Sequence, residues 1–411
     1  MKFRTVLSAA AGIFLLGAAG CCTGTSCPQR QISSSPLKED VKLLLPEKIY
    51  AVPGVETNIY FENVVRVINP DNYIFFAKAP YGRCDEKRWR YTPGPGDPRS
   101  FKVRVSVTGS SGLLAEKDVT VEVASATAGK GKKITMLIVG DSLTDATVYP
   151  RRILELFKKN GNPSAAQIGR HAGYGRPVVR GGAAHEGYGG WTWERFLTRW
   201  TDDAAFAKLK KRRDTIYARS PFLKQVNGKP VLDMKDYFKR TNGGKAPDFI
   251  TFQLGVNDIF SATDATIEKR IETIFGHMDK LLAEARKAAP DAVIGVGLPT
   301  PGCFTQDGFG RNYKSRHARW QYKKNQHRLV EAMMQKFAKS NPYKVELVPV
   351  YLNLDCENNF PAVRENVNGG NVKRMIRQSN GVHPSPEGYR QIGDTYYCWM
   401  KAVLSRPEQK Q

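Results

Sequence analysis

The chain has 411 residues, of which 41% are hydrophobic and 25% are charged. A chain of this size and composition has room for a large core and more than one domain, which excludes a small binding module, a disordered chain and a fibrous protein. Lysine and arginine total 63 against 39 aspartates and glutamates, giving a formal net charge of +24. Such an excess favours an anionic partner: nucleic acid, an anionic surface or a polyanionic sugar.

Residues 1–20 form a predicted signal peptide. Lys2 and Arg4 precede an apolar run over 6–20, which is shorter than the roughly 20 residues needed to cross a bilayer. The run ends at Cys21 and resembles the lipobox of bacterial lipoproteins, so we expect lipidation of Cys21 and a polar tether over 21–43. The alternative is a plain secretory signal. Either way the chain is expected to be exported, and lipidation would anchor it to the bacterial cell envelope, on the periplasmic or the surface face of the outer membrane.

Residues 44–125 alternate between apolar and polar side chains. The alternation is clearest over 101–107 and 119–123, and turn-forming Pro, Gly and Asn residues separate the runs. This pattern predicts a small antiparallel β-sandwich domain. A small-residue stretch over 125–131 is the expected boundary.

Residues 132–405 have the texture of an α/β domain. Continuous apolar runs, typical of strands buried on both faces, alternate with helical patterns. This alternation predicts a parallel sheet whose site lies at the carboxyl ends of the strands. The apolar runs are 134–139, 249–254, 292–296 and 345–350, and the longest helical patterns are 264–289 and 315–340.

Four candidate residues follow from that rule. Ser142 comes directly after the first strand, and Asn257 follows the strand at 249–254. Gly187 lies in a glycine-rich stretch between them, and His383 lies in a loop before the last helix. A serine alone at such a position is more often a helix cap. Together with a histidine base and oxyanion donors, however, it forms a complete set for acyl transfer.

Four blocks occur in the order and spacing of the SGNH (GDSL) hydrolase family, which this region resembles: GDSLT at 140–144, GYGGWT at 187–192, GVND at 255–258 and GVHP at 381–384. The resemblance implies a flavodoxin-like three-layer α/β/α fold and ester hydrolysis without a metal or cofactor. By position it implies that Ser142 is the nucleophile, that Ser142, Gly187 and Asn257 form the oxyanion hole, and that His383 is the general base. With the N-terminal β-domain, the chain is similar to lipoprotein carbohydrate esterases of Bacteroidetes.

Asn380 departs from the family pattern, which has aspartate three residues before the histidine. An asparagine can orient the imidazole through its carbonyl oxygen but brings no charge. Three alternatives follow: a Ser-His-Asn triad or Ser-His dyad, a substitute acid such as Asp355, or an inactive glycan-binding protein.

Further residues bear on the substrate. His185 and Trp191 flank the glycine-rich block and are expected to bind substrate, although a buried aromatic core is the alternative for Trp191. The basic segment 195–245 is either a solvated surface or an insertion that overhangs the active site. Cys303 and Cys356 are either a disulfide or free buried thiols.

The sequence therefore predicts a serine esterase that removes acetyl or other short acyl groups from a glycan. Export and the absence of a nucleic-acid motif direct the charge toward an acidic glycan rather than DNA or RNA. The alternatives are a lipase or lysophospholipase-type hydrolase and a catalytically silent glycan-binding lipoprotein.

Overall fold

The structure is a computed structural model that describes residues 41–94 and 96–407. The predicted signal peptide, Cys21 and most of the predicted tether lie outside the described residues. The last tether positions do not behave as a tether: Val41 and Leu43 are buried, and Leu43 forms a bridge with Val65. Within the described residues no helix is long and apolar enough to cross a membrane.

The N-terminal part contains two sheets, in the strand orders β1-β7-β6-β3 and β2-β5-β4. The pairs are antiparallel as expected, except that β1 runs parallel to β7. The sheets pack through aromatic rings: Phe101 lies edge-on to Trp89 and Tyr91 of the other sheet, with centroids 6.2 and 5.1 Å apart. The elements are β1 (Lys48–Ala51), β2 (Thr57–Tyr60), α1 (Phe61–Val64), a 3-10 turn (Pro70–Asn72), β3 (Ile74–Lys78), β4 (Arg83–Cys84), β5 (Arg88–Tyr91), β6 (Ser100–Gly109) and β7 (Gly112–Val123).

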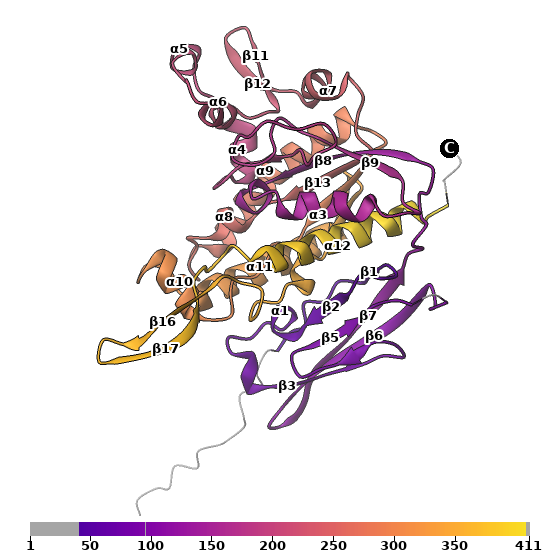
Figure 1. The fold of residues 1–411 in the computed structure, drawn as a ribbon, viewed down its shortest axis with the longest axis vertical. Coiled ribbons are helices and arrows are strands. Elements are labelled where there is room, and N and C mark those ends of the chain that lie inside the picture. The colour runs from indigo at the N-terminus through magenta and orange to yellow at the C-terminus, as the bar shows by residue number, and fades with distance from the viewer. Residues whose placement is uncertain (1–40, 95, 408–411) are drawn as a thin grey trace, which may run out of the picture. The chain divides into compact units, whose positions relative to one another are not determined.

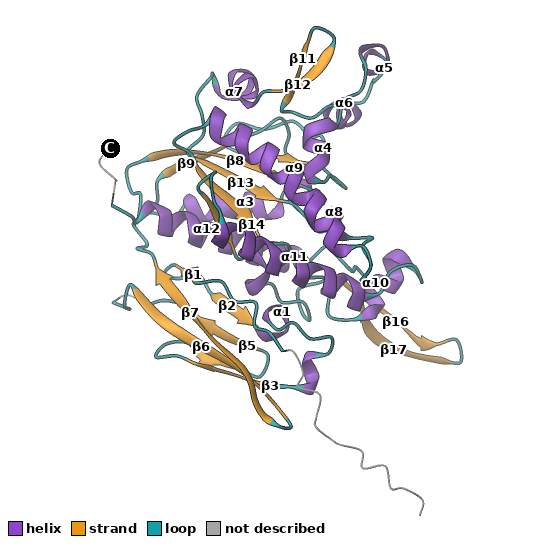
Figure 2. Ribbon diagram, turned by 180° about the vertical axis from the view of Figure 1, so that it is seen from behind, coloured by secondary structure: helices purple, strands orange, loops and turns teal. Residues whose placement is uncertain are grey.

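The C-terminal part is built on a parallel sheet with the order β10-β8-β13-β14-β15, in which β9 also pairs with β8. Its strands are β8 (Lys133–Gly140), β9 (Ser164–Ile168), β10 (Glu186–Gly187), β13 (Phe249–Gln253), β14 (Val293–Gly297) and β15 (Val345–Val348). Helices α3 (Val148–Phe157) and α12 (Pro386–Leu404) cover one face, whereas α4 (Trp193–Thr198), α9 (Ile267–Ala288) and α11 (Arg319–Lys339) cover the other (Figures 1 and 2). The expected three-layer α/β/α fold is confirmed.

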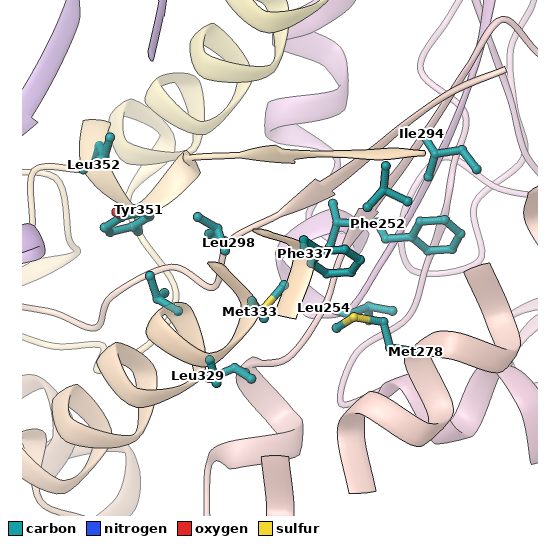
Figure 3. Packing of buried hydrophobic residues seen from close by; sticks show 14 of the residues in the cluster. Phe252, Leu254, Met278, Ile294, Leu298, Leu329, Met333, Phe337, Tyr351 and Leu352 are labelled. Carbon is teal, nitrogen blue, oxygen red and sulfur yellow. The ribbon is translucent and has the colours of Figure 1, made fainter. Parts of the chain in front are cut away.

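The sheet's core is formed by β-branched and aromatic side chains facing the long helices. Phe252 and Leu254, from β13 and the residue after it, face Met278 of α9 and Met333 and Phe337 of α11 (Figure 3). All five side chains are at most 8% exposed, because strands covered on both faces present no polar side.

The remaining elements surround the carboxyl edge of the sheet. They are α2 (Ser142–Asp145), α5 (Asp203–Ala207), α6 (Arg212–Ala218), the hairpin β11 (Leu223–Val226) and β12 (Lys229–Leu232), α7 (Met234–Asn242), α8 (Val256–Ile259), α10 (Gln306–Tyr313), a 3-10 turn (Val350–Asn353), and the hairpin β16 (Ala362–Asn368) and β17 (Asn371–Gln378). The basic segment thus folds as α5, α6, β11, β12 and α7, which cluster together (Figure 1).

Buried hydrogen bonds join the strand-rich part to the α/β part. The Asn58 backbone N–H and side-chain amide both donate to Asn353 Oδ1, at 2.9 and 2.8 Å. The Asn63 amide donates to the carbonyl oxygens of Tyr351 and Leu354, both at 2.8 Å. Because apolar clusters also run across this junction, residues from Val41 onward form one compact unit.

The cysteine alternatives resolve toward free thiols. Cys303 and Cys356 are both buried and unpaired with each other. The Cys303 thiol donates to the Thr305 carbonyl oxygen, and the Cys356 thiol to Asn63 Oδ1.

Candidate active site

Ser142 and His383 meet at the carboxyl edge of the sheet. Ser142 opens α2 directly after β8, where Asp141 caps the helix by accepting the Leu143 N–H at 2.9 Å. His383 lies in the loop between β17 and α12, and its Nε2 is 2.9 Å from Ser142 Oγ. Because Ser142 is the first helical residue, its backbone N–H has no acceptor within the helix.

The electrostatic setting of His383 favours a neutral imidazole. Burial lowers the pKa of His383 below its usual value of 6.5. A neutral ring at pH 7 leaves Nε2 able to accept the Ser142 proton.

Asn380 does not contact the imidazole as the sequence suggested. Its Oδ1 accepts the backbone N–H groups of Val382 and His383, at 3.1 and 2.9 Å. Among the described residues, no hydrogen bond joins the Asn380 side chain to the His383 ring. Asn380 therefore shapes the turn that carries the histidine, as Asn side chains commonly do, and does not orient the ring.

Asp355 is engaged elsewhere, so it is not a substitute acid. It accepts the Tyr60 hydroxyl at 3.1 Å and the Asn358 backbone N–H at 2.9 Å. In the part of the chain that the structure describes, it makes no hydrogen bond to His383. The arrangement is a Ser-His dyad.

Asn257 lies beside the glycine-rich loop. Its amide donates one hydrogen bond to the Trp191 carbonyl oxygen at 3.0 Å. An amide has two N–H groups, so the second remains for a ligand.

The assignment of Gly187 to the oxyanion hole is wrong. Its backbone N–H donates to His185 Nδ1 at 3.1 Å, in a buried position. The next two amides are also engaged, Tyr188 with the Gly140 carbonyl oxygen at 3.0 Å and Gly189 with the Tyr217 hydroxyl. Gly190 is exposed at φ 75°, where an added Cβ would meet nothing. The open donor of this loop is therefore the Gly190 N–H.

The expectation that His185 and Trp191 bind substrate is also wrong. His185 is fully buried and burial holds its pKa well below 6.5. Because Nδ1 accepts from Gly187, the neutral ring carries its proton on Nε2 and donates to Thr147 Oγ1 at 3.0 Å. Trp191 is 2% exposed and stacks on Tyr188 with centroids 4.1 Å apart. Both residues support the loop from below.

Two buried carboxylates lie under the site. The first cause in each case is burial, which raises the pKa of Asp141 and of Asp258 to about 7. Within the described residues, one oxygen of each has no hydrogen-bond partner. Burial of charge without full pairing is costly, so protonation of either group stabilises this region.

Asp145 is a site residue that the sequence analysis missed. It is buried in the same short helix as Ser142. Its Oδ1 accepts the Tyr174 backbone N–H at 2.6 Å, and its Oδ2 accepts the Tyr217 hydroxyl. Neither tyrosine lies in a motif, so no sequence signal linked them to Asp145. Among the described residues no group of histidine, cysteine or acidic side chains could hold a metal ion.

The fold and the Ser142–His383 pair at its sheet edge define a serine hydrolase of the α/β class. Residues 138–391 match the model of the GDSL-like Lipase/Acylhydrolase family. Since this match spans more than half of the chain, the protein belongs to that family and is a serine ester hydrolase of the SGNH type.

Similar solved structures include a family 3 carbohydrate esterase of Clostridium thermocellum, with 15% identity and a TM-score of 0.37, covering 67% of this chain and 100% of that one. A carbohydrate acetylesterase family member from Sinorhizobium meliloti has 15% identity and a TM-score of 0.36, covering 66% and 100%. A possible lipase from Chitinophaga pinensis DSM 2588 has 13% identity and a TM-score of 0.36, covering 66% and 98%. No curated protein matches the chain.

Proposed function

We propose that the protein is an exported, lipid-anchored serine esterase that removes acetyl or other short acyl groups from a glycan. The observation that carries the esterase part is the 2.9 Å contact between Ser142 Oγ and His383 Nε2 beside the exposed Gly190. Exposed Tyr174 and Arg176 near this edge suit a polar sugar better than a long acyl chain. Export and anchoring at Cys21 rest on the N-terminal sequence.

In the proposed reaction, Ser142 Oγ attacks the acyl carbonyl while His383 Nε2 takes its proton. The N–H groups of Ser142 and Gly190 and the second amide N–H of Asn257 stabilise the oxyanion. His383 then protonates the departing sugar hydroxyl, and water releases the acyl group from Ser142 in a second, equivalent step.

The test measures acetate release from acetylated oligosaccharides and hydrolysis of p-nitrophenyl acetate and p-nitrophenyl octanoate. We expect Ser142-dependent acetate release and a preference for acetate over octanoate esters. Faster hydrolysis of the octanoate ester would favour the lipase alternative, and no turnover of any ester would overturn the esterase proposal.

The lowered pKa of His383 predicts the pH dependence. Because the free base is required, kcat/KM should fall on acidification with a midpoint below pH 6.5. Asn380→Asp adds a negative charge beside the imidazole, which favours the imidazolium. We expect this variant to raise the midpoint by about one pH unit and to increase kcat.

The matched control is Asn380→Ala, which removes the turn contacts of Oδ1 without adding charge. It should lower kcat with little change in the midpoint. An unchanged pH profile in Asn380→Asp would contradict this electrostatic account of His383.

A further inference from the structure

The second strand of the parallel sheet is interrupted beside Ser142. β9 ends at Ile168 and β10 begins at Glu186, yet both run parallel to β8, which leads into Ser142. Residues 169–185 therefore leave the sheet and return to it, and a bridge between His171 and His185 closes the base of this excursion. The excursion stands at the carboxyl edge, where ligands of open α/β sheets bind.

The outer turn of the excursion is tightly fixed. Gly173, Tyr174 and Gly175 all have positive φ, at 86°, 50° and 72°. A Cβ on Gly173 would lie 2.1 Å from Thr147 Oγ1, and one on Gly175 would lie 2.6 Å from Arg213 Cα. A non-glycine residue at positive φ is uncommon and is held here by the bond from the Tyr174 N–H to Asp145. The turn is pressed between the Ser142 region and α6, and it leaves the Tyr174 side chain 49% exposed.

Two tyrosine-arginine pairs meet at Asp145. The Arg176 guanidinium lies 5.6 Å from the Tyr174 ring centroid, and the Arg213 guanidinium lies 5.4 Å from that of Tyr217. Tyr174 and Tyr217 bond to opposite oxygens of Asp145, which is in the same short helix as Ser142. The pairs are therefore positioned relative to the nucleophile through one carboxylate.

The two guanidinium groups are exposed and carry uncompensated charge. Among the described residues, neither Arg176 nor Arg213 forms an ion pair, and Arg176 Nε donates only to the Gly173 carbonyl oxygen, at 3.3 Å. Neighbouring arginines differ: Arg219 pairs with Asp203 at 2.6 Å, and Arg170 with Glu186 at 3.3 Å. Guanidinium forks with free donors bind planar or tetrahedral anions in two-pronged fashion.

We propose that Arg176 and Arg213, on their tyrosines, form a binding subsite for an anionic group of the glycan, the carboxylate of a uronic acid or a sulfate ester, on a sugar near the acylated one. This inference rests on the proposed function. The tyrosine rings hold the guanidinium groups and offer an apolar face to the sugar, while the arginines bind the anion. The subsite places the selectivity for acidic glycans in these two residues rather than in the net charge of the chain.

The test compares the double variant Arg176→Gln/Arg213→Gln with the wild-type protein on two acetylated substrates, an oligogalacturonide and a neutral xylo-oligosaccharide. We expect the double variant to lower kcat/KM for the oligogalacturonide about 10- to 100-fold more than for the xylo-oligosaccharide. Most of the loss should appear in KM. The control Lys229→Gln/Lys235→Gln removes two exposed positive charges from the same inserted segment and should change the ratio of the two rates less than twofold.

A binding measurement separates this inference from the proposed function. Ser142→Ala protein is titrated with unacylated oligogalacturonate and, separately, with a sulfated oligosaccharide. Binding of either that is salt-dependent and lost in the arginine variant supports the subsite, and the tighter of the two identifies the anion. Normal turnover of both esters with equal effects of the arginine and lysine variants would overturn the subsite alone. Absence of turnover with every substrate would instead overturn the esterase proposal.

Discussion

Ser142→Ala is expected to lower kcat/KM for ester hydrolysis by about 10⁴-fold or more, and His383→Ala by a similar factor. The two side chains are in direct contact at 2.9 Å, so each is ineffective without the other. Removing the hydroxyl leaves no nucleophile, and removing the imidazole leaves a serine that stays protonated at neutral pH. The measurement is p-nitrophenyl acetate turnover at pH 7.5, with circular dichroism to verify folding.

The double variant tests whether the pair acts as one unit. Ser142→Ala/His383→Ala should be scarcely slower than either single variant, because the same step is already lost. A suitable control is His317→Ala, which changes a histidine in the connection between α10 and α11 and should retain nearly full activity. Multiplicative losses in the double variant would show that Ser142 and His383 act independently and would contradict the dyad.

The strands and the Ser-His pair could be predicted from the sequence because each leaves a local signal. A strand buried on both faces is a continuous apolar run, and the run at 134–139 lies within β8. The carboxyl-edge rule then gives positions for Ser142 and Asn257 without any contact information. The long helices α9 and α11 were likewise predicted to within a few residues of their ends.

The supports of the site could not be predicted, since they depend on which backbone groups are already bonded. Gly187 and Gly190 look alike in the sequence, and only the bond from Gly187 to His185 Nδ1 distinguishes them. Burial of Trp191 depends on Tyr188, which stacks on it. β9 was missed because its buried residues are few and its run, SAAQI, is weakly apolar.

Asn257→Ala is expected to reduce kcat by about 100- to 1,000-fold, the usual cost of losing one side-chain oxyanion donor. The Asn257 amide makes two separable contributions. One N–H holds the glycine-rich loop through the Trp191 carbonyl oxygen at 3.0 Å, and the other faces the position of the developing oxyanion. Loss of the first disturbs substrate binding and raises KM, whereas loss of the second raises the barrier of the chemical step alone.

Two further variants separate these contributions. Trp191→Phe keeps the backbone carbonyl oxygen and loosens the stacking on Tyr188, so it should affect thermal stability and KM more than kcat. Asn257→Asp keeps the shape of the side chain but places a carboxylate against a negatively charged intermediate, so its kcat should fall below that of Asn257→Ala. If Asn257→Ala instead raised KM with kcat unchanged, the residue would serve only to hold the loop. The oxyanion would then depend on the backbone N–H groups of Ser142 and Gly190.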